Sequence, residues 1–389
     1  MTKGIRVPPL HISSQFDSGA IEVVSLDDLR NIELRIRRDT AAEFAQWFHF
    51  CLHGANGRNV VLKFLNAGEC AYPKGWEGYR VVASHDRQNW FRIDTEYDGH
   101  VMTAQTVPQA QSIYFAYFEP YSHEQHLDLL ALAGASPLVE VQYLGATVQG
   151  RDMTVLRITS AQAQPQDTGK KRIWIIARQH PGETMAEWFV EGCLERLLDV
   201  DDAVSRLLLE RCELYVVPNM NPDGSVLGNL RTNAAGANLN REWQEPSMDR
   251  SPEVFLVRQK MLETGVDLCL DVHGDEGLPH NFVVGSEGIP AYTPRIAELE
   301  DAFKTSWQAV CPDFQDAVNY GRSEPGKANM ALATNWVAQQ FGCLALTVEM
   351  PFKDNANLPD RSIFLSWLGA GCCQRTPRAW CSITWPWLK

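Results

Sequence analysis

Short segments in which apolar and polar positions alternate dominate the first part of the chain, up to about residue 120. They are rich in β-branched and aromatic residues, and Gly, Asn and Asp separate them, which is typical of β-strands. Their regular spacing predicts an antiparallel β-sandwich. The segments are residues 21–24, 32–37, 47–52, 60–64, 79–83 and 112–117.

The pattern changes after about residue 122, where helical periodicity alternates with short apolar runs. This alternation predicts an α/β fold with a mixed, mostly parallel sheet flanked by helices. Open sheets of this kind bind ligands at the carboxyl ends of their strands. The helical segments are residues 123–132, 183–198, 203–211, 254–264, 296–309 and 328–340, and the strand-like ones are residues 172–177, 213–217, 268–272, 281–284 and 343–349.

The two patterns divide the chain into an N-terminal β-sandwich domain, residues 1–122, and an α/β domain, residues 123–370. The tail, residues 371–389, is basic, rich in Trp and Cys, and has no clear period. We therefore treat it as a separate, atypical segment.

The composition is that of a globular protein, with 45% hydrophobic and 21% charged residues in a chain of 389. The net charge of −13 argues against nucleic acid or an anionic membrane as the main partner. No apolar segment reaches the roughly 18 residues of a membrane-spanning helix, and the N-terminus lacks the apolar region of a secretory signal. The ten cysteines form no C-x-x-C pair, so we expect reduced thiols and a cytoplasmic protein.

A histidine and a glutamate, His180 and Glu183, lie between a predicted strand and a predicted helix. Residues three apart on a helix share a face, so both side chains would point into the crevice above the sheet. Alone, this spacing is weak evidence for a metal site, because it occurs by chance in many proteins and also fits a polar turn. His273 follows the strand at residues 268–272 and would reach the same crevice, although by itself a histidine here favours a locally hydrogen-bonded turn. Together the three match the two-histidine, one-glutamate pattern of catalytic zinc, which leaves one position open for water.

Polar residues follow two further strands. Glu349 ends a very apolar segment, where a buried carboxylate requires a partner. It is either a structural cap or ion-pair residue, or a general base that takes a proton from the attacking water. The loop of residues 216–243, rich in Asn, Gly and Pro, carries Arg231 and Arg241. These arginines would bind a carboxylate or polarise a carbonyl, or else face solvent from a loop of Asx turns.

Taken in order, these motifs resemble those of the zinc metallocarboxypeptidases, and in particular the cytosolic carboxypeptidase-like branch, in which a β-sandwich precedes the catalytic domain. The segment F-A-Y-F-E-P-Y at residues 115–121 also resembles that branch, and the resemblance extends over roughly residues 20 to 365. The motifs are H-P-G-E at 180–183, N-P-D-G at 221–224, G-N-x-R at 228–231, L-N-R at 239–241, D-x-H-G at 271–274 and the strand-end Glu349.

The resemblance implies a zinc carboxypeptidase whose substrate is the C-terminus of a peptide or protein. His180, Glu183 and His273 would bind one zinc ion per chain. Glu349 would act as the general base and then donate the proton to the leaving amine.

The loop residues would act on the substrate. The resemblance implies that Arg231 stabilises the oxyanion of the tetrahedral intermediate. Asn240 and Arg241 would hold the terminal carboxylate, with Arg241 bidentate, which confines hydrolysis to the last peptide bond.

Two positions depart from the family pattern. Many relatives have an aspartate that orients the first zinc histidine, where this chain has Asn238. An amide oxygen can still accept a hydrogen bond from an imidazole, but without a charge. Secreted relatives use a mobile tyrosine near the substrate, for which Tyr320 is a candidate, although it fits a surface turn equally well.

Eukaryotic members of this branch remove acidic C-terminal residues, so an acidic preference is one hypothesis for this chain. It would require a basic pocket, for which Arg322, Lys327 and Lys353 lie in the relevant segments.

Two alternatives to a carboxypeptidase remain. A deacylase of N-acyl amino acids would share several of the motifs, but the N-P-D-G loop, the two arginines and the preceding sandwich favour a carboxypeptidase. A non-catalytic binding protein on the same fold would normally have lost a ligand or the base, and here all are present.

Overall fold

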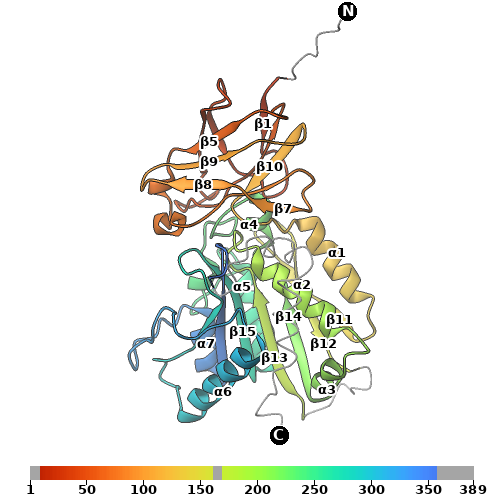
Figure 1. The fold of residues 1–389 in the computed structure, drawn as a ribbon. Helices are drawn as coiled ribbons and strands as arrows, with labels where there is room; N and C mark the ends of the chain where they lie inside the picture. Colours follow the sequence, from red (N-terminus) through yellow and green to blue (C-terminus); the bar gives the residue numbers. More distant parts are fainter. Residues whose placement is uncertain (1–8, 161–168, 357–389) are drawn as a thin grey trace, which may run out of the picture.

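The protein consists of two parts arranged end to end, as a computed structural model that describes residues 9–160 and 169–356 shows (Figure 1). The predicted tail at residues 371–389 lies outside the described residues. Two sheets of five strands each form the N-terminal part, and a larger sheet with helices on both faces forms the rest. The predicted fold class, an α/β sheet preceded by an antiparallel β-sandwich, is confirmed.

The N-terminal sheets pack face to face around a core of aromatic and aliphatic side chains, in which Phe48 lies 4.7 Å from Phe64 between ring centroids. One sheet has the order β1 (His11–Ser13), β4 (His49–His53), β10 (Ser112–Ala116), β6 (Val82–Ser84) and β7 (Trp90–Arg92). The other has the order β2 (Glu22–Ser25), β3 (Ile32–Arg35), β5 (Val60–Phe64), β9 (Met102–Thr106) and β8 (Asp94–Tyr97). Two short 3₁₀ helices, η1 (Ala67–Glu69) and η2 (Pro73–Trp76), lie between β5 and β6.

One strand pair in this sandwich is parallel. β3 and β5 pair in parallel, whereas the other pairings of the two sheets are antiparallel. The connection between them passes through β4 in the opposite sheet, and such a crossover returns the chain in the same direction.

The large sheet has seven strands, and its central four strands, β14, β13, β15 and β17, run parallel. The outer strands β11, β12 and β16 pair antiparallel. The order is β11 (Val139–Ala146), β12 (Asp152–Ile158), β14 (Cys212–Val217), β13 (Lys171–Ala177), β15 (Leu268–Asp275), β17 (Leu344–Pro351) and β16 (Phe282–Val284).

Helices cover both faces of this sheet, and each face has its own apolar core. One core takes side chains from α1 (His123–Gly134), α2 (Met185–Leu197), α3 (Ala203–Arg211) and α6 (Pro294–Val310). The other takes them from α5 (Pro252–Thr264) and α7 (Ala333–Phe341). The carboxyl ends of the parallel strands face the N-terminal sandwich, since Arg92 of β7 donates to the carbonyl of Phe352, just after β17, at 2.7 Å.

Several elements differ from the sequence-based prediction. The hairpin of β11 and β12 was not predicted, because β11 is an edge strand without regular alternation of buried positions. The loop at residues 216–243 contains α4 (Pro222–Leu227) and η3 (Leu239–Arg241). Helix α7 begins at Ala333, later than predicted, because the Asn329 side chain accepts from the backbone of Ala331 and holds a turn there.

Cys51, Cys70, Cys193, Cys212, Cys269, Cys311 and Cys343 are free and buried, which agrees with the expected reduced thiols, and the other three cysteines lie outside the described residues. Within residues 9–160 and 169–356, none of the helices combines the length and the apolar character that crossing a membrane requires.

Glu119 lies buried in the linker between the two parts of the protein, with 3% of its surface exposed. Its carbonyl accepts a hydrogen bond from Thr184 at 2.7 Å, which ties the linker to the start of α2. Burial raises the pKa of the Glu119 carboxyl from 4.5 to about 8, and the negative charge of Glu191 adds to the effect. Burial in the linker therefore favours the protonated, uncharged form of this carboxyl group.

We expect Glu119→Gln to flatten the pH dependence of stability. The raised pKa means that the folded chain binds this proton more tightly than the unfolded chain does. The resulting contribution to the free energy of unfolding is therefore full below about pH 4.5 and is lost as the pH rises towards about 8. Gln carries no titrating group, and the melting temperature of the variant should fall less across that range. Thermal unfolding from about pH 5 to 8 measures this. The exposed Glu124→Gln should follow the wild-type profile, and an identical profile for Glu119→Gln would refute the assignment.

Candidate metal centre

His180 and Glu183 lie in a tight turn between β13 and α2, and not on the helix as predicted, because α2 begins only at Met185. The backbone N–H of Glu183 donates to the carbonyl of His180 at 3.1 Å, and this turn brings the two side chains together. Arg178 opens the turn in the left-handed region, with φ 59°. Its buried guanidinium donates to the carbonyl of Pro181 at 2.9 Å and to Glu187 at 2.7 Å. A buried arginine thus fixes the path of the turn.

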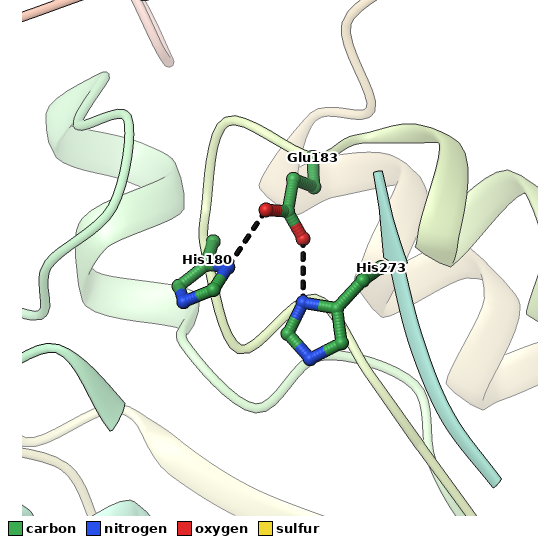
Figure 2. Close-up of side chains that lie close together, drawn as sticks. All are labelled: His180, Glu183 and His273. Carbon is green, nitrogen blue, oxygen red and sulfur yellow. Dashed lines mark hydrogen bonds and ion pairs between the residues drawn. The ribbon is translucent and has the colours of Figure 1, made fainter. Parts of the chain in front are cut away.

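The three predicted metal ligands meet in one buried cluster (Figure 2). The Glu183 carboxylate lies between the two imidazoles, with one oxygen 2.7 Å from Nδ1 of His180 and the other 2.7 Å from Nδ1 of His273. The potential ligand atoms of the three residues all lie within 4.8 Å of one another. His273 lies inside β15, which runs to Asp275 and is longer than predicted.

The far nitrogen of each histidine has its own partner, which orients the ring. Nε2 of His180 lies 3.0 Å from the amide oxygen of Asn238, the contact that the sequence suggested. Nε2 of His273 lies 2.9 Å from a carboxylate oxygen of Asp271. Gln179 donates to the same carboxylate at 2.8 Å and holds it in place. Both Nδ1 atoms are therefore directed to the space beside Glu183.

These partners give the two histidines opposite pKa shifts. Burial and the positive charge of Arg231 lower the pKa of His180 to about 4, and the neutral amide of Asn238 adds no negative charge to oppose them. Burial opposes the charge of His273 as well, but the carboxylates of Asp271 and Glu183 outweigh it and raise its pKa well above the ordinary value. Burial likewise disfavours the charge of Glu183, yet the two imidazoles hold its pKa below the ordinary value. The substitution of a charged partner by Asn238 thus makes the centre asymmetric.

The donor set fits a zinc ion. Two imidazole nitrogens and one carboxylate are the ligands that catalytic zinc takes in proteins, with a further position left open. All three residues are buried, and the ring nitrogens that face away from the cluster are hydrogen-bonded. Within the described residues, this is the one group of three or more His, Cys, Asp or Glu side chains with such spacing.

Glu349 faces this cluster from the neighbouring strand. It stands opposite His273 in the register of β15 and β17, and 6% of its surface is exposed. Its Oε2 is buried without a hydrogen-bond partner in the described part of the chain. Burial raises the pKa of Glu349 well above its ordinary value, with the carboxylates of Glu183, Asp275 and Glu276 adding to the effect of burial and His273 opposing it. A carboxyl group placed in this way favours proton uptake.

A cavity of about 690 Å³ opens above the cluster, and Arg231, Asn240 and Arg241 line it. Neither Arg231 nor Arg241 forms an ion pair with a carboxylate of the described residues. Asn240 accepts from the backbone of Ala333 at 2.9 Å through its Oδ1, which turns its Nδ2 towards His273 at 3.3 Å. The cavity therefore combines a metal-type cluster with two guanidinium groups that have no carboxylate partner among the described residues.

The other candidates divide between the cavity and the surface. Tyr320 lines the cavity, and its hydroxyl donates to Asp275. Arg322 pairs with Glu287 at 3.1 Å away from the cavity, and Lys327 is exposed. Lys353 is buried and donates to the carbonyl of Gly277. Of the three basic residues considered for an acidic pocket, none lines the cavity.

Sequence reasoning missed two groups of residues at this site. Asp271 alternates with His273 along β15, which was a usable signal, whereas Gln179 lies in the turn after β13 next to His180. The N-terminal sandwich was not expected here at all, yet residues 71–75 line the cavity beside the cluster. No local pattern in that segment indicates a role in a site formed by distant residues.

Comparison with known families gives matches to both parts of the chain. Residues 124–367 match the family described as zinc carboxypeptidase. Residues 12–118 match the family described as the cytosolic carboxypeptidase N-terminal domain.

Individual proteins give the same result. A metallo-carboxypeptidase from Burkholderia cenocepacia is 49% identical, with a TM-score of 0.90 over 95% of this chain and 99% of that chain. A metallo-carboxypeptidase from Pseudomonas aeruginosa, in complex with (2-guanidinoethylmercapto)succinic acid, is 47% identical, with a TM-score of 0.90 over 96% and 97%. Cytosolic carboxypeptidase 6 of Mus musculus is 28% identical over 299 residues, which is 70% of this chain and 54% of that protein.

Proposed function

The chain belongs to the zinc carboxypeptidase family, and from this premise we propose that it removes the C-terminal residue from peptides or protein tails with one bound zinc ion. One observation carries the proposal. A single cavity brings together the buried cluster of His180, Glu183 and His273, the carboxyl of Glu349 and two guanidinium groups that pair with no carboxylate in the described part of the chain. Such a cavity suits a substrate that presents both a scissile carbonyl and a free carboxylate.

His180, Glu183 and His273 would hold the zinc ion. When bound, zinc supplies Lewis-acid chemistry, which makes water more acidic and polarises a carbonyl. Asn238 and Asp271 keep both Nδ1 atoms turned towards Glu183.

Glu349 is the proposed proton carrier. Its Oε2, which has no hydrogen-bond partner among the described residues, takes a proton from the attacking water and then delivers it to the nitrogen of the leaving amine. The raised pKa favours the protonated form that the second step requires.

The arginines are proposed to bind the two negative charges that a carboxypeptidase must handle. Arg231 stabilises the charge that develops on the scissile oxygen. Arg241 binds the terminal carboxylate, and Nδ2 of Asn240 supplies a further donor. Substrate bound in this way places its last peptide bond over the cluster, which explains exopeptidase action.

A preference for acidic C-terminal residues is the finer part of the proposal. Lys74 supports it, because this lysine lines the cavity together with Arg231 and Arg241 and has no carboxylate partner among the described residues. The ligand of the Pseudomonas aeruginosa relative carries both a succinate and a guanidino group, so both acidic and basic side chains belong in the substrate screen.

We also propose the division into a sandwich domain at residues 1–122, a catalytic domain at 123–370 and a tail at 371–389. The positions of the two family matches, 12–118 and 124–367, support the first boundary. A cytoplasmic location is proposed on the names of the cytosolic carboxypeptidase relatives.

The function is tested by assay of the zinc-loaded protein on N-blocked dipeptides that differ only in the last residue. The same peptides with an amidated C-terminus and the matching N-acetyl amino acids serve as comparisons. Cleavage of the free-acid dipeptides alone supports a carboxypeptidase. Preferred cleavage of N-acetyl amino acids would identify a deacylase, and cleavage of no substrate would contradict the proposal.

Arg241→Ala should raise KM for free-carboxylate peptides by about 100-fold, because it removes the charged partner of the terminal carboxylate. Steady-state kinetics on free and amidated peptides measure this change. Arg250→Ala, which removes an arginine paired with Glu242 outside the cavity, is the matched control and should leave KM unchanged. Unaltered discrimination against amidated peptides in Arg241→Ala would rule out this role for the arginine.

A further inference from the structure

The N-terminal sandwich forms hydrogen bonds with the loop that carries Arg231. The carboxylate of Asp39 accepts hydrogen bonds from the backbone N–H groups of Leu230, Arg231 and Thr232 at 2.6, 2.9 and 2.9 Å. The hydroxyl of Thr232 donates to the same carboxylate at 2.9 Å. A buried side chain of the sandwich thus fixes the backbone on both sides of the arginine.

Two aromatic rings of the sandwich then hold the side chain of Arg231. Its guanidinium carbon lies 5.7 Å from the ring centroid of Phe44 and 5.6 Å from that of Tyr72. Cation–π contacts of this length attract the guanidinium and restrict its orientation. In sequence the arginine belongs to the α/β part of the chain, in the loop between α4 and η3, but contacts from the sandwich position it.

Tyr72 is itself held firmly. Its backbone N–H donates to the side chain of Gln46 at 3.1 Å, and its carbonyl accepts from the same amide at 3.2 Å. Gln46 is fully buried. Two residues beyond the proline of η2, Gly75 packs so closely on Glu276 that an added Cβ would lie 3.0 Å from the Cβ of Glu276. The segment that carries Tyr72 is therefore fixed against both parts of the protein.

Tyr72 reaches the cavity from the N-terminal sandwich. Its phenol interacts electrostatically with four charged residues that line the same cavity, namely Arg231, Glu276, Glu183 and Arg241. Within residues 9–160 and 169–356 the hydroxyl has no hydrogen-bond partner. Burial raises the pKa of Tyr72, so the hydroxyl is protonated at neutral pH and is available as a donor.

We propose that Tyr72 completes the active centre from the N-terminal sandwich. Its hydroxyl donates a hydrogen bond to the terminal carboxylate of the substrate beside Arg241, and its ring, together with Phe44, positions Arg231. The proposal rests on the carboxypeptidase function above, since it assigns a residue to the binding of the same carboxylate. It gives the sandwich a role in substrate binding and not only in folding.

Tyr72→Phe and Tyr72→Ala separate the two roles, because Phe keeps the ring and removes only the hydroxyl. Tyr72→Phe should raise KM about tenfold with kcat unchanged, the effect of one lost hydrogen bond to a charged group. Tyr72→Ala should in addition lower kcat about tenfold, because Arg231 loses one of its rings. Phe44→Leu should lower kcat without changing KM.

The kinetics are measured on zinc-loaded full-length protein with free and amidated dipeptides, together with zinc content and melting temperature. Tyr143, which is 63% exposed on β11, provides matched controls, and its Phe and Ala variants should resemble the wild type. Wild-type kinetics for Tyr72→Phe, or a loss confined to kcat, would overturn the role of the hydroxyl. Equal kinetics for Tyr72→Phe and Tyr72→Ala would overturn the role of the ring. An inactive wild type would instead contradict the carboxypeptidase function itself.

Discussion

Replacement of Glu349 by Gln should lower kcat by about three orders of magnitude while zinc stays bound. Gln has nearly the same shape, but its amide cannot take up a proton and return it. Oε2 of Glu349 is buried and has no hydrogen-bond partner in the described residues, so the substitution breaks no contact that the structure contains at that atom. The three cluster residues are untouched, and KM should therefore change little.

Steady-state kinetics and zinc analysis of the same preparation check this expectation. Glu253→Gln is a matched control, because Glu253 is also fully buried, burial raises its pKa to about 7, and it lies outside the cavity. That variant should keep the wild-type kcat. Wild-type turnover in Glu349→Gln would show that another group moves the proton.

The sequence predicted best those elements whose environment is simple. β5 was predicted at Val60–Phe64, the residues it occupies, because its positions alternate between buried and partly buried. The hairpin of β11 and β12 escaped prediction, because β11 lies at the edge of the sheet and its exposed positions follow no period of two. Hydrophobic alternation reports burial on one face, and an edge strand provides little of it.

The site could be predicted as far as its residues follow strands. His180, Glu183, His273 and Glu349 all lie near the carboxyl ends of adjacent parallel strands, so the α/β topology alone brings them together. The local geometry predicted from the sequence was wrong in one respect. The first pair shares a turn and not a helix face, because Arg178 adopts a left-handed conformation that nothing in the local sequence indicates.

The contribution of the sandwich could not be predicted, because it depends on contacts between segments far apart in the chain. Asp39 binds backbone groups 191 to 193 residues away. Its partners are N–H groups, which every residue except proline possesses, so no side-chain motif marks them. Tyr72 and Phe44 read as ordinary aromatic residues of a β-sandwich, and only the fold reveals that their rings face Arg231.

Glu183→Gln should abolish activity through loss of the metal. The carboxylate of Glu183 is the link between the two histidines, with each oxygen 2.7 Å from one Nδ1 and the backbone N–H of Gly274 donating to Oε2 at 3.1 Å. An amide offers a single oxygen and no charge. Its NH₂ group also directs a hydrogen-bond donor at one of the imidazoles. A donor in that position stabilises neither a protonated imidazole nor a bound cation. Turnover should fall to the background of the assay.

Zinc affinity, measured by competition with a chromophoric chelator, separates loss of metal from loss of fold. Zinc affinity of Glu183→Gln should fall by more than the roughly 100-fold that removal of a hydrogen-bond partner of a ligand costs. Zinc should also no longer raise the melting temperature of this variant. Asn238→Ala is the comparison, because it removes only the outer partner of His180 and should weaken zinc binding less. If Glu183→Gln bound zinc as tightly as the wild type, the carboxylate would not be a ligand, and the two histidines would need a different third partner.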